Sequence, residues 1–144
     1  MPKIMVVYGT RPEAIKLVTV IRALSATPGV EVVRKSERFR EPTVACLGLS
    51  YKANVDDLRE SPAIDIVAAI ARSRPDLDIR VAEPLTHMLP HQLADLPNVR
   101  LEGASDAIAA ADIVVLLVDH DHFKALSRSR LAGKVVYDTR GLWR

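Results

Sequence analysis

The sequence predicts an α/β protein: a single domain of three layers, in which a parallel sheet of about six or seven strands is covered by helices on both faces. Two observations predict this fold class. Short, continuously apolar segments recur along the chain, and Asp112–Val118 (DIVVLLV) is the clearest of them. Such segments are typical of strands that are buried on both faces of a sheet. Between them lie segments with the period of amphipathic helices, and alternation of strands with helices favours a parallel arrangement.

The size and composition of the chain agree with one globular domain and restrict its partners. The chain has 144 residues, of which 49% are hydrophobic, which is enough for one packed core. Its 20 basic and 18 acidic residues give a net charge of +2 and are mixed along the sequence. Since there is no long basic run, we expect no nucleic-acid partner and no membrane-surface partner. The apolar run Ile4–Tyr8 is too short for a signal peptide or a membrane span.

The chain begins with a predicted strand, helix and strand. Lys3–Tyr8 (KIMVVY) has the composition of a strand, and a tight turn follows it. Glu13–Ser25 carries its apolar residues on one broad face, which predicts a helix, and Val30–Val33 predicts a second strand. Arg34–Pro42 (RKSERFREP) is charged and fits neither period, so it predicts a linker. We expect the segment before this linker to add a strand or two at one edge of the sheet.

The stretch after the linker has the strongest functional signal. Val44–Leu49 predicts a buried strand with Gly48 at its carboxyl end, and a charged loop of about ten residues follows. Ser61 and Pro62 then have the residue types of an N-cap and a first helical position, opening the helix Ala63–Ala71. In open α/β sheets, ligands bind outside the carboxyl ends of the strands. This loop is therefore the first candidate site.

The remaining elements continue the alternation. A short helix is predicted at Ser105–Ala111, with Ser105 as its cap, and a short helix or a turn at Asp119–Leu126. Further strands are predicted at Asp78–Ala82, Asn98–Leu101, Asp112–Val118 and Lys134–Asp138. We expect four segments to pair as parallel strands: Val44–Leu49, Ile79–Ala82, Ile113–Val118 and Val135–Tyr137. We also expect Val114, Leu116 and Leu117 to be buried at the centre of the sheet.

Three cations of the sequence suggest an anion site. Lys52 and Arg59 flank the start of the predicted helix, where backbone N–H groups and the helix dipole favour a phosphate. Arg140 follows the last predicted strand and should reach the same edge of the sheet. We expect Lys52 and Arg140 on neighbouring strand ends, close enough to hold one diphosphate. The alternative is a solvated loop with a local Asp–Arg pair.

Other chemistry-bearing residues give weaker signals. His120 and His122 alternate with Asp119 and Asp121, which is a conceivable metal cluster. Two histidines without further ligands at the spacing of a metal site are a weak signal, so we expect no metal ion. The single cysteine, Cys46, excludes an intrachain disulfide and fits a cytoplasmic location; inside an apolar strand it is expected to be inert. Neither a G-x-G-x-x-G nor a Walker motif is present.

Three motifs carry a resemblance to a known family. LGLSYKANVDDLRESPAIDI, VLLVDHDHFKAL and VVYDTRGLWR resemble the carboxyl-terminal domain of the UDP-glucose/GDP-mannose dehydrogenase family, in particular members acting on UDP-N-acetylmannosamine. The resemblance covers roughly residues 35–144 and implies a Rossmann-like, UDP-binding domain at residues 43–144. It implies that Tyr51, Lys52 and Arg140 contact the nucleotide sugar and that Arg59 faces the NAD cofactor of the parent family.

The first third resembles a different enzyme family. VVYGTRPEAIKLVTVIRAL is similar to the opening of non-hydrolysing UDP-N-acetylglucosamine 2-epimerases, over residues 1–33. This resemblance implies that Arg11 and Lys16 contact UDP. The two families act in succession on the same nucleotide sugar. We therefore expect a fusion of two fragments through the linker at residues 34–42.

The resemblances imply binding without catalysis. The dehydrogenase family's NAD domain and catalytic cysteine motif are not found in the sequence, and Cys46 does not match that cysteine. Without a nucleophile or a bound hydride acceptor, the reaction cannot be assembled. We expect a UDP-sugar-binding remnant that is inactive alone. The alternatives are an interaction module that docks on a complete dehydrogenase or forms a homodimer, and one part of a split NAD-dependent dehydrogenase.

Overall fold

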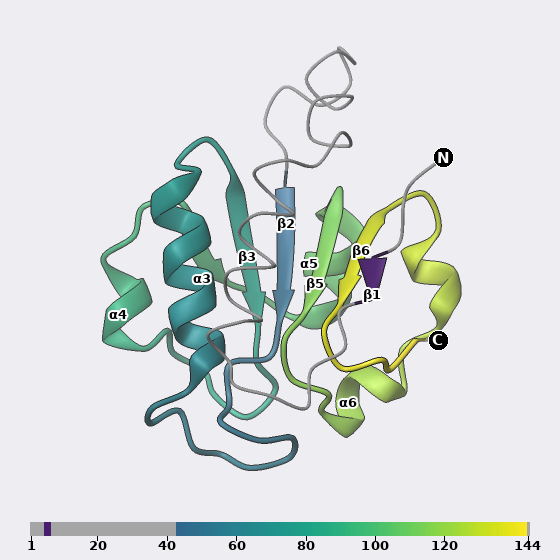
Figure 1. Ribbon diagram of the computed structural model, residues 1–144, viewed down its shortest axis with the longest axis horizontal. Coiled ribbons are helices and arrows are strands. Elements are labelled where there is room, and N and C mark those ends of the chain that lie inside the picture. The colour runs from purple at the N-terminus through teal and green to yellow at the C-terminus, as the bar shows by residue number, and fades with distance from the viewer. Residues whose placement is uncertain (1–4, 7–42, 144) are drawn as a thin grey trace.

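The computed structural model describes residues 5–6 and 43–143, and Figure 1 shows a sheet between two layers of helices. The sheet has six parallel strands in the order β1-β6-β5-β2-β3-β4. The strands are β1 (Met5–Val6), β2 (Thr43–Leu47), β3 (Asp78–Ala82), β4 (Val99–Leu101), β5 (Ile113–Leu116) and β6 (Val135–Asp138). The helices are α3 (Pro62–Ser73), α4 (His91–Ala94), α5 (Ala104–Ala110), α6 (Asp121–Lys124) and the 3₁₀ turn η1 (Arg128–Leu131).

The parallel pairing predicted from the apolar segments is confirmed. β2 lies between β3 and β5, with Val44 opposite both Ile79 and Ile113, and β5 in turn pairs with β6. Val114 and Leu116 of β5 are fully buried in the centre of the sheet. Leu117, directly after β5, is also buried. From β2 onwards, the five strands lie in the order β4-β3-β2-β5-β6. With β2 counted as the first strand, this is the order 3-2-1-4-5 of the doubly wound, Rossmann-like fold. The predicted fold class is therefore confirmed.

Alternating side chains of the strands form a core on each face of the sheet. On one face, Val44 and Cys46 of β2 pack in a cluster with α3 and α4, whereas Ala45 and Leu47 pack on the other face with α5. This alternation follows from the two-residue period of a strand. Because both faces of β2 and β5 are covered, these strands have no polar face, which explains their continuously apolar sequences. β3 and β4 lie toward one edge of the sheet and carry the part-exposed Arg80 and the exposed Arg100.

The helix boundaries confirm one predicted cap and correct another. Ser61 is the N-cap residue of α3 with Pro62 at the first position, as predicted, but its side chain makes no capping hydrogen bond. Ser105 is not a cap. Gly103 is the N-cap residue of α5 and its carbonyl accepts from the Ala107 N–H, so the helix begins one residue earlier than predicted.

The first third of the chain is described only at β1. The Met5–Val6 strand lies within the predicted Lys3–Tyr8 segment and pairs with β6. It forms one edge of the sheet, so the expected extra strand at one edge is observed. The helix predicted at Glu13–Ser25, the strand at Val30–Val33 and the linker at Arg34–Pro42 lie outside the described residues. Within the described part of the chain, every helix is too short or too polar to cross a bilayer.

Candidate functional site

The carboxyl edge of the sheet, where the strand arrows of Figure 1 end, carries the candidate site. The chain order reverses between β2 and β5: β3 and β4 lie to one side of this pair, and β6 lies to the other. Loops that leave such a reversal point diverge and leave a crevice, which is where open α/β sheets bind ligands. The residues after β2 and after β5 therefore face the same crevice.

Gly48 allows the loops after β2 and β5 to approach each other closely. Its φ is +98°, and a Cβ atom at this position would lie 2.5 Å from Val118 Cβ. The backbone N–H groups of Leu117 and Val118 both donate to the Leu47 carbonyl, at 2.9 and 3.2 Å. A glycine is thus required here by both conformation and space.

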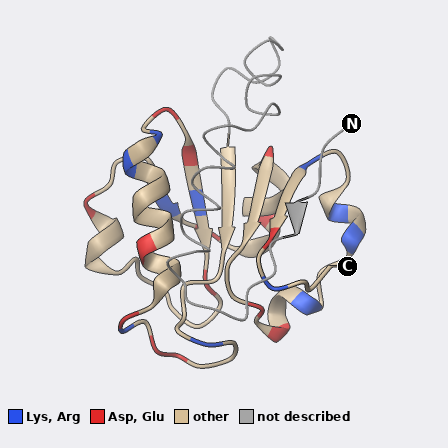
Figure 2. Ribbon diagram, viewed as in Figure 1, with Lys and Arg blue, Asp and Glu red and all other residues tan. Residues whose placement is uncertain are grey.

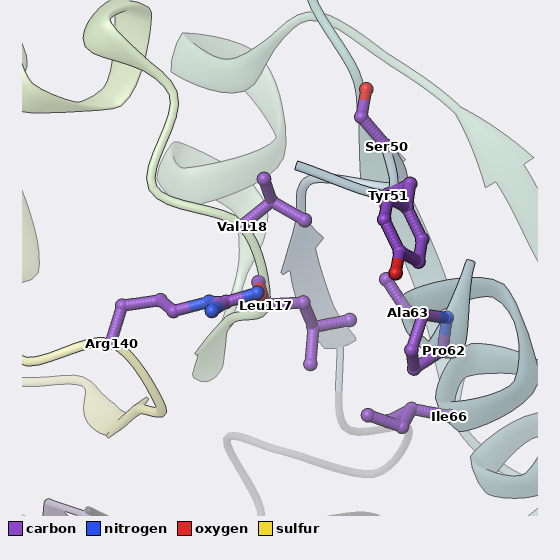
Figure 3. Close-up of a pocket in the computed structure, with 8 residues that line it drawn as sticks. All are labelled: Ser50, Tyr51, Pro62, Ala63, Ile66, Leu117, Val118 and Arg140. Carbon is purple, nitrogen blue, oxygen red and sulfur yellow. The ribbon is translucent and has the colours of Figure 1, made fainter. Parts of the chain in front are cut away.

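A small pocket lies at this point, and Figure 3 shows Tyr51 and Arg140 on its opposite sides. Leu117 and Val118 lie between them, and the first turn of α3 closes the pocket through Pro62, Ala63 and Ile66. The cavity measures about 20 Å³, the space of about one water molecule. A ligand larger than an ion would therefore lie across its mouth and not inside it.

A buried carboxylate shapes the turn that presents Arg140. Asp138, at the end of β6, accepts the backbone N–H groups of Arg140, Gly141 and Trp143 at 3.0, 2.7 and 2.8 Å. The Arg140 Nε donates to the Leu117 carbonyl at 3.0 Å and lies 4.0 Å from Asp119 Oδ1. Within the described part of the chain, the two terminal guanidinium nitrogens have no hydrogen-bond partner. They are the groups that a carboxylate or phosphate prefers.

Lys52 does not line this pocket, and the expectation that it neighbours Arg140 needs correction. β5 lies between β2 and β6, so the two residues do not follow neighbouring strands. Two strand spacings separate β2 from β6, roughly 10 Å. The Lys52 ammonium lies 5.8 Å from the centroid of the Tyr51 ring, and both side chains are exposed. A diphosphate could contact both cations only by spanning the crevice.

Arg59 forms the local pair that the alternative interpretation anticipated. Its Nε donates to Asp57 Oδ1 at 3.1 Å and its Nη2 to Asp57 Oδ2 at 3.2 Å. Hydrogen bonds from Arg59 hold the pKa of Asp57 below its usual value. The Arg59 side chain is 89% exposed, so this pair is open to solvent and remains available to a larger partner.

A buried pair behind the loop was missed by the sequence analysis. Glu83 Oε2 accepts the N–H groups of Leu49 and Ser50, at 2.6 and 3.1 Å, and lies 3.0 Å from His120 Nε2. Burial alone would raise the pKa of Glu83, but the hydrogen bonds from His120, Leu49 and Leu85 outweigh it and lower that pKa. The only local signal was Glu83 itself, a charged residue directly after the apolar pair Val81 and Ala82 at the end of β3.

The histidine cluster is not arranged for a metal ion. His120 is buried, and its Nδ1 accepts the Asn54 N–H at 2.8 Å, so both ring nitrogens have protein partners. His122 is exposed and packs edge-on against Phe123. Among the described residues, no group of three or more His, Cys, Asp and Glu side chains could hold a metal ion.

Two buried hydroxyl groups at the site have no hydrogen-bond partner among the described residues. They are Ser50 Oγ, beside the pocket, and Ser61 Oγ, at the start of α3. A buried hydroxyl without a partner is costly. Ser50 was not a candidate in the sequence analysis, because no local pattern distinguishes a loop serine that faces a pocket from one that faces solvent.

Cys46 is fully buried, and burial raises the pKa of its thiol to about 12, so it stays protonated and unreactive. Arg11 and Lys16 lie outside the described residues. Figure 2 shows basic and acidic positions interspersed over the loops and helices, which agrees with a local anion site and not with a broad basic surface.

Comparison with protein families assigns a class to this arrangement. The sequence model of the UDP-glucose/GDP-mannose dehydrogenase family, UDP binding domain, matches residues 45–144. The matched region begins inside β2 and includes every described residue of the candidate site.

Individual relatives agree. An NDP-N-acetyl-D-galactosaminuronic acid dehydrogenase of Ralstonia solanacearum is 46% identical over 136 residues, which cover 92% of this chain and 31% of the relative. A UDP-N-acetyl-D-mannosamine dehydrogenase of Salmonella typhi is 44% identical over 108 residues, covering 75% of this chain and 25% of the relative. A solved UDP-N-acetyl-mannosamine dehydrogenase of S. aureus superposes with a TM-score of 0.61 and 27% identity, covering 88% of this chain and 27% of that one.

The extent of these matches has two consequences. The chain spans 31% or less of the length of these relatives. The Ralstonia alignment, at 92% of the chain, is too long to be confined to residues 34–144, so it also includes part of residues 1–33. The resemblance of that segment to an epimerase, and the fusion of two fragments, remain predictions.

Proposed function

Because the chain belongs to the UDP-glucose/GDP-mannose dehydrogenase family through its UDP binding domain at residues 45–144, we propose that it binds a UDP-sugar across the crevice between β2 and β5. The observation that carries this proposal is the pocket that Tyr51 and Arg140 flank at the reversal point of the sheet. The matched relatives named above are dehydrogenases of N-acetylated sugars. The proposed ligand is therefore a UDP-N-acetylhexosamine.

The proposed pose places the diphosphate between cations from two sides. Arg140 offers its terminal guanidinium nitrogens from the β6 side, and Lys52 offers an exposed ammonium from the β2 side. Ser50 also lines the pocket, but its hydroxyl oxygen is buried and lies away from Arg140, so we assign it no contact with the diphosphate. The Tyr51 ring is 46% exposed and offers an apolar face to the nucleotide. Two cations that act on one partly desolvated dianion give charge-assisted hydrogen bonds.

The proposal excludes catalysis by these residues alone. Cys46, the only cysteine of the chain, is buried in β2 with a thiol pKa of about 12, so it cannot serve as a nucleophile. In the parent family the cofactor is NAD, and we propose that Arg59 lies toward it when an NAD domain is present. Hydride transfer would need that domain, whether it comes from the same protein or from a partner.

The segment before β2 is proposed to contribute further contacts. β1 runs parallel to β6 and ends at Val6, at the carboxyl edge of the sheet, and Arg11 follows five residues later in the sequence. This supports a role for Arg11 and Lys16 in binding UDP, as the resemblance to the epimerases implies. If Arg11→Ala and Lys16→Ala both bind UDP as tightly as the parent, this role is wrong.

Titration calorimetry with UDP on the full 144-residue chain tests the site. We expect a dissociation constant of about 10–1000 μM, roughly 4–7 kcal/mol, because the residues of this site would hold the nucleotide from one side only. Lys52→Ala and Arg140→Ala should each weaken binding by about 1.5–3 kcal/mol, the scale of a hydrogen bond to a charged group. Binding should also weaken with added salt.

Two arginine variants serve as controls. Arg59→Ala should change UDP affinity much less, since its proposed partner is NAD. Arg72→Ala removes the same charge from an exposed position in the last turn of α3, at the other end of that helix from the pocket. If the Lys52 and Arg140 variants bind UDP like these controls, the nucleotide site is wrong.

Exposed apolar side chains favour a second candidate, an interaction module. Tyr51 and Val55 after β2, and Leu85 and Met88 after β3, are 46%, 44%, 37% and 76% exposed. Apolar groups gathered on loops at one edge of a sheet are typical of a docking surface. A chain that does not bind UDP but co-elutes with a complete dehydrogenase would favour this candidate. Activity with NAD and UDP-N-acetylmannosamine, gained only on mixing with an NAD-domain chain, would indicate a split enzyme.

A further inference from the structure

We propose that His120, acting with Glu83, positions the loop Leu49–Asn54 for nucleotide binding. His120 holds Asn54 at one end of this loop, and Glu83 holds Leu49 and Ser50 at the other. The inference rests on the proposed function, since the loop between these anchors carries Tyr51 and Lys52. It assigns a role to two residues that make no contact with the ligand in the proposed pose.

The pair joins three strand ends at the reversal point. Glu83 follows β3, His120 follows β5, and the loop they hold follows β2. The His120 side chain is 1% exposed and the Glu83 side chain is fully buried, with 3.0 Å between Nε2 and Oε2. A further N–H group, that of Leu85, donates to Glu83 Oε1 at 3.1 Å and fixes the second carboxylate oxygen. The carboxylate therefore has little freedom to turn.

The hydrogen bonds define the protonation state of the ring. The Asn54 backbone N–H can only donate, so His120 Nδ1, at 2.8 Å, must be the unprotonated acceptor. The ring proton then lies on Nε2 and is donated to the Glu83 carboxylate. An imidazolium would point a second N–H at the Asn54 N–H, so the loop is held only by the neutral ring with its proton on Nε2.

Other hydrogen bonds act on the same loop together with the two anchors. Asn54 has φ of +62°, a left-handed conformation that an asparagine adopts at some cost, and its Oδ1 accepts the Asp121 N–H at 2.9 Å. The Tyr51 N–H donates to the carbonyl of Asp57, beyond the end of this loop, at 2.8 Å. Holding the backbone before Tyr51 and after Lys52 thus limits where both side chains can project.

A positioning role explains why a polar pair is buried here. Glu83 and His120 do not cover Tyr51 or Lys52, because both of those side chains are exposed. A buried polar pair is commonly no more stabilising than apolar residues of the same volume. Its advantage is direction, because a carboxylate and an imidazole ring can hold specific N–H groups, whereas an apolar pair would leave those groups without acceptors.

Two amide variants of His120 separate its two contacts. The side-chain oxygen of asparagine can take the place of Nδ1 and accept the Asn54 N–H, whereas the amide nitrogen of glutamine can take the place of Nε2 and donate to Glu83. We expect His120→Gln to weaken UDP binding about tenfold and His120→Asn to stay within about threefold of the parent, because only the former leaves the Asn54 N–H without an acceptor. His122→Gln, at an exposed position two residues later, is the matched control and should bind UDP like the parent.

Nuclear magnetic resonance on the labelled full chain provides a readout that does not depend on UDP. In the parent, the His120 ring should show an unprotonated Nδ1 and a scalar coupling across the N–H···N hydrogen bond from Asn54. In His120→Gln, the amide protons of Asn54 and Tyr51 should exchange faster than in the parent and in His120→Asn. This measurement decides whether the ring holds the loop.

The outcomes are distinguishable from a failure of the proposed function. A parent chain that does not bind UDP contradicts the proposed function, and the exchange rates alone then decide the role of His120. Unchanged exchange of Asn54 and Tyr51 in His120→Gln, or a protonated Nδ1 in the parent, overturns the positioning role. So does parent-like UDP affinity in His120→Gln, or a loss in His120→Asn as large as in His120→Gln.

Discussion

Glu83 keeps its charge in the interior because N–H groups converge on both of its oxygens. Three of them are backbone groups, those of Leu49, Ser50 and Leu85, and the fourth belongs to His120. A buried carboxylate with this many donors is stabilised in its charged form. Because the pKa of Glu83 is lowered in the folded state, the charged form of this residue stabilises the folded domain.

The first prediction concerns acid stability. Since the folded-state pKa of Glu83 lies below its ordinary value of 4.5, its contribution is complete above about pH 4.5 and is lost as pH falls through the folded-state pKa. In Glu83→Gln, the free energy of unfolding should be lower at neutral pH and should fall less than that of the parent below about pH 4.5. Urea titrations at a series of pH values measure this.

A matched control isolates the role of burial. Glu60→Gln removes the same charge from an exposed position of the loop before α3. Its unfolding free energy should follow the parent across the same pH range. If the parent and Glu83→Gln lose stability in parallel on acidification, the hydrogen bonds of Glu83 do not stabilise its charged form.

At the scale of elements, the crevice depends on how closely the ends of β2 and β5 approach. Gly48 makes this possible, and its N–H donates to the Ala82 carbonyl at 2.8 Å, so it also continues the pairing with β3. One residue thus joins the three strand ends on which the site is built. A larger residue would separate the Tyr51 loop from Val118.

Gly48→Ala is therefore expected to destabilise the domain by about 2–4 kcal/mol. The positive φ accounts for about 1–3 kcal/mol and crowding against Val118 for the rest. Thermal or urea unfolding measures the change. Gly133→Ala is the control, because Gly133 also has a positive φ, of +77°, but no atom lies within 4 Å of an added Cβ. Equal losses in the two variants would show that crowding contributes nothing.

The centre of the sheet gives a second prediction at this scale. Leu116 is fully buried in β5 between β2 and β6, and Leu116→Asp would place an unpaired charge between two packed layers. We expect circular dichroism to show an unfolded variant at 25 °C. The free energy needed to bury the charge is comparable to or larger than the whole free energy of unfolding of a typical domain, about 5–15 kcal/mol. Val55→Asp, at an exposed position, should fold like the parent.

At the scale of the whole molecule, self-association is the open prediction. An exposed apolar surface on a single chain favours association with a partner. The exposed side chains of Leu85 and Met88 agree with such a surface. We expect a dimer by light scattering at protein concentrations of tens of micromolar. A monomeric mass there would contradict it, and Met88→Lys should weaken the dimer if this surface is the interface.

The sequence by itself determined where most strands and helices lie and which edge of the sheet carries the candidate site. Continuous apolar segments predicted buried parallel strands, and the positions of β2, β3, β5 and β6 follow them closely. Lys52 and Arg140 could be assigned to the carboxyl edge because each follows a strand, and in a parallel sheet all strands end at the same edge. These inferences need only the period and the length of each segment.

Tertiary structure alone decided which residues meet at that edge. The order of the strands placed β5 between β2 and β6, which separated Lys52 from Arg140 and brought Tyr51 opposite Arg140. It also joined Glu83 to His120, 37 residues apart in the sequence, and Asn54 to His120, 66 residues apart. Local patterns report whether a segment is apolar and periodic, but a contact across the sheet depends on strand order. That order is fixed by how the helices pack on the two faces, and no single segment records it.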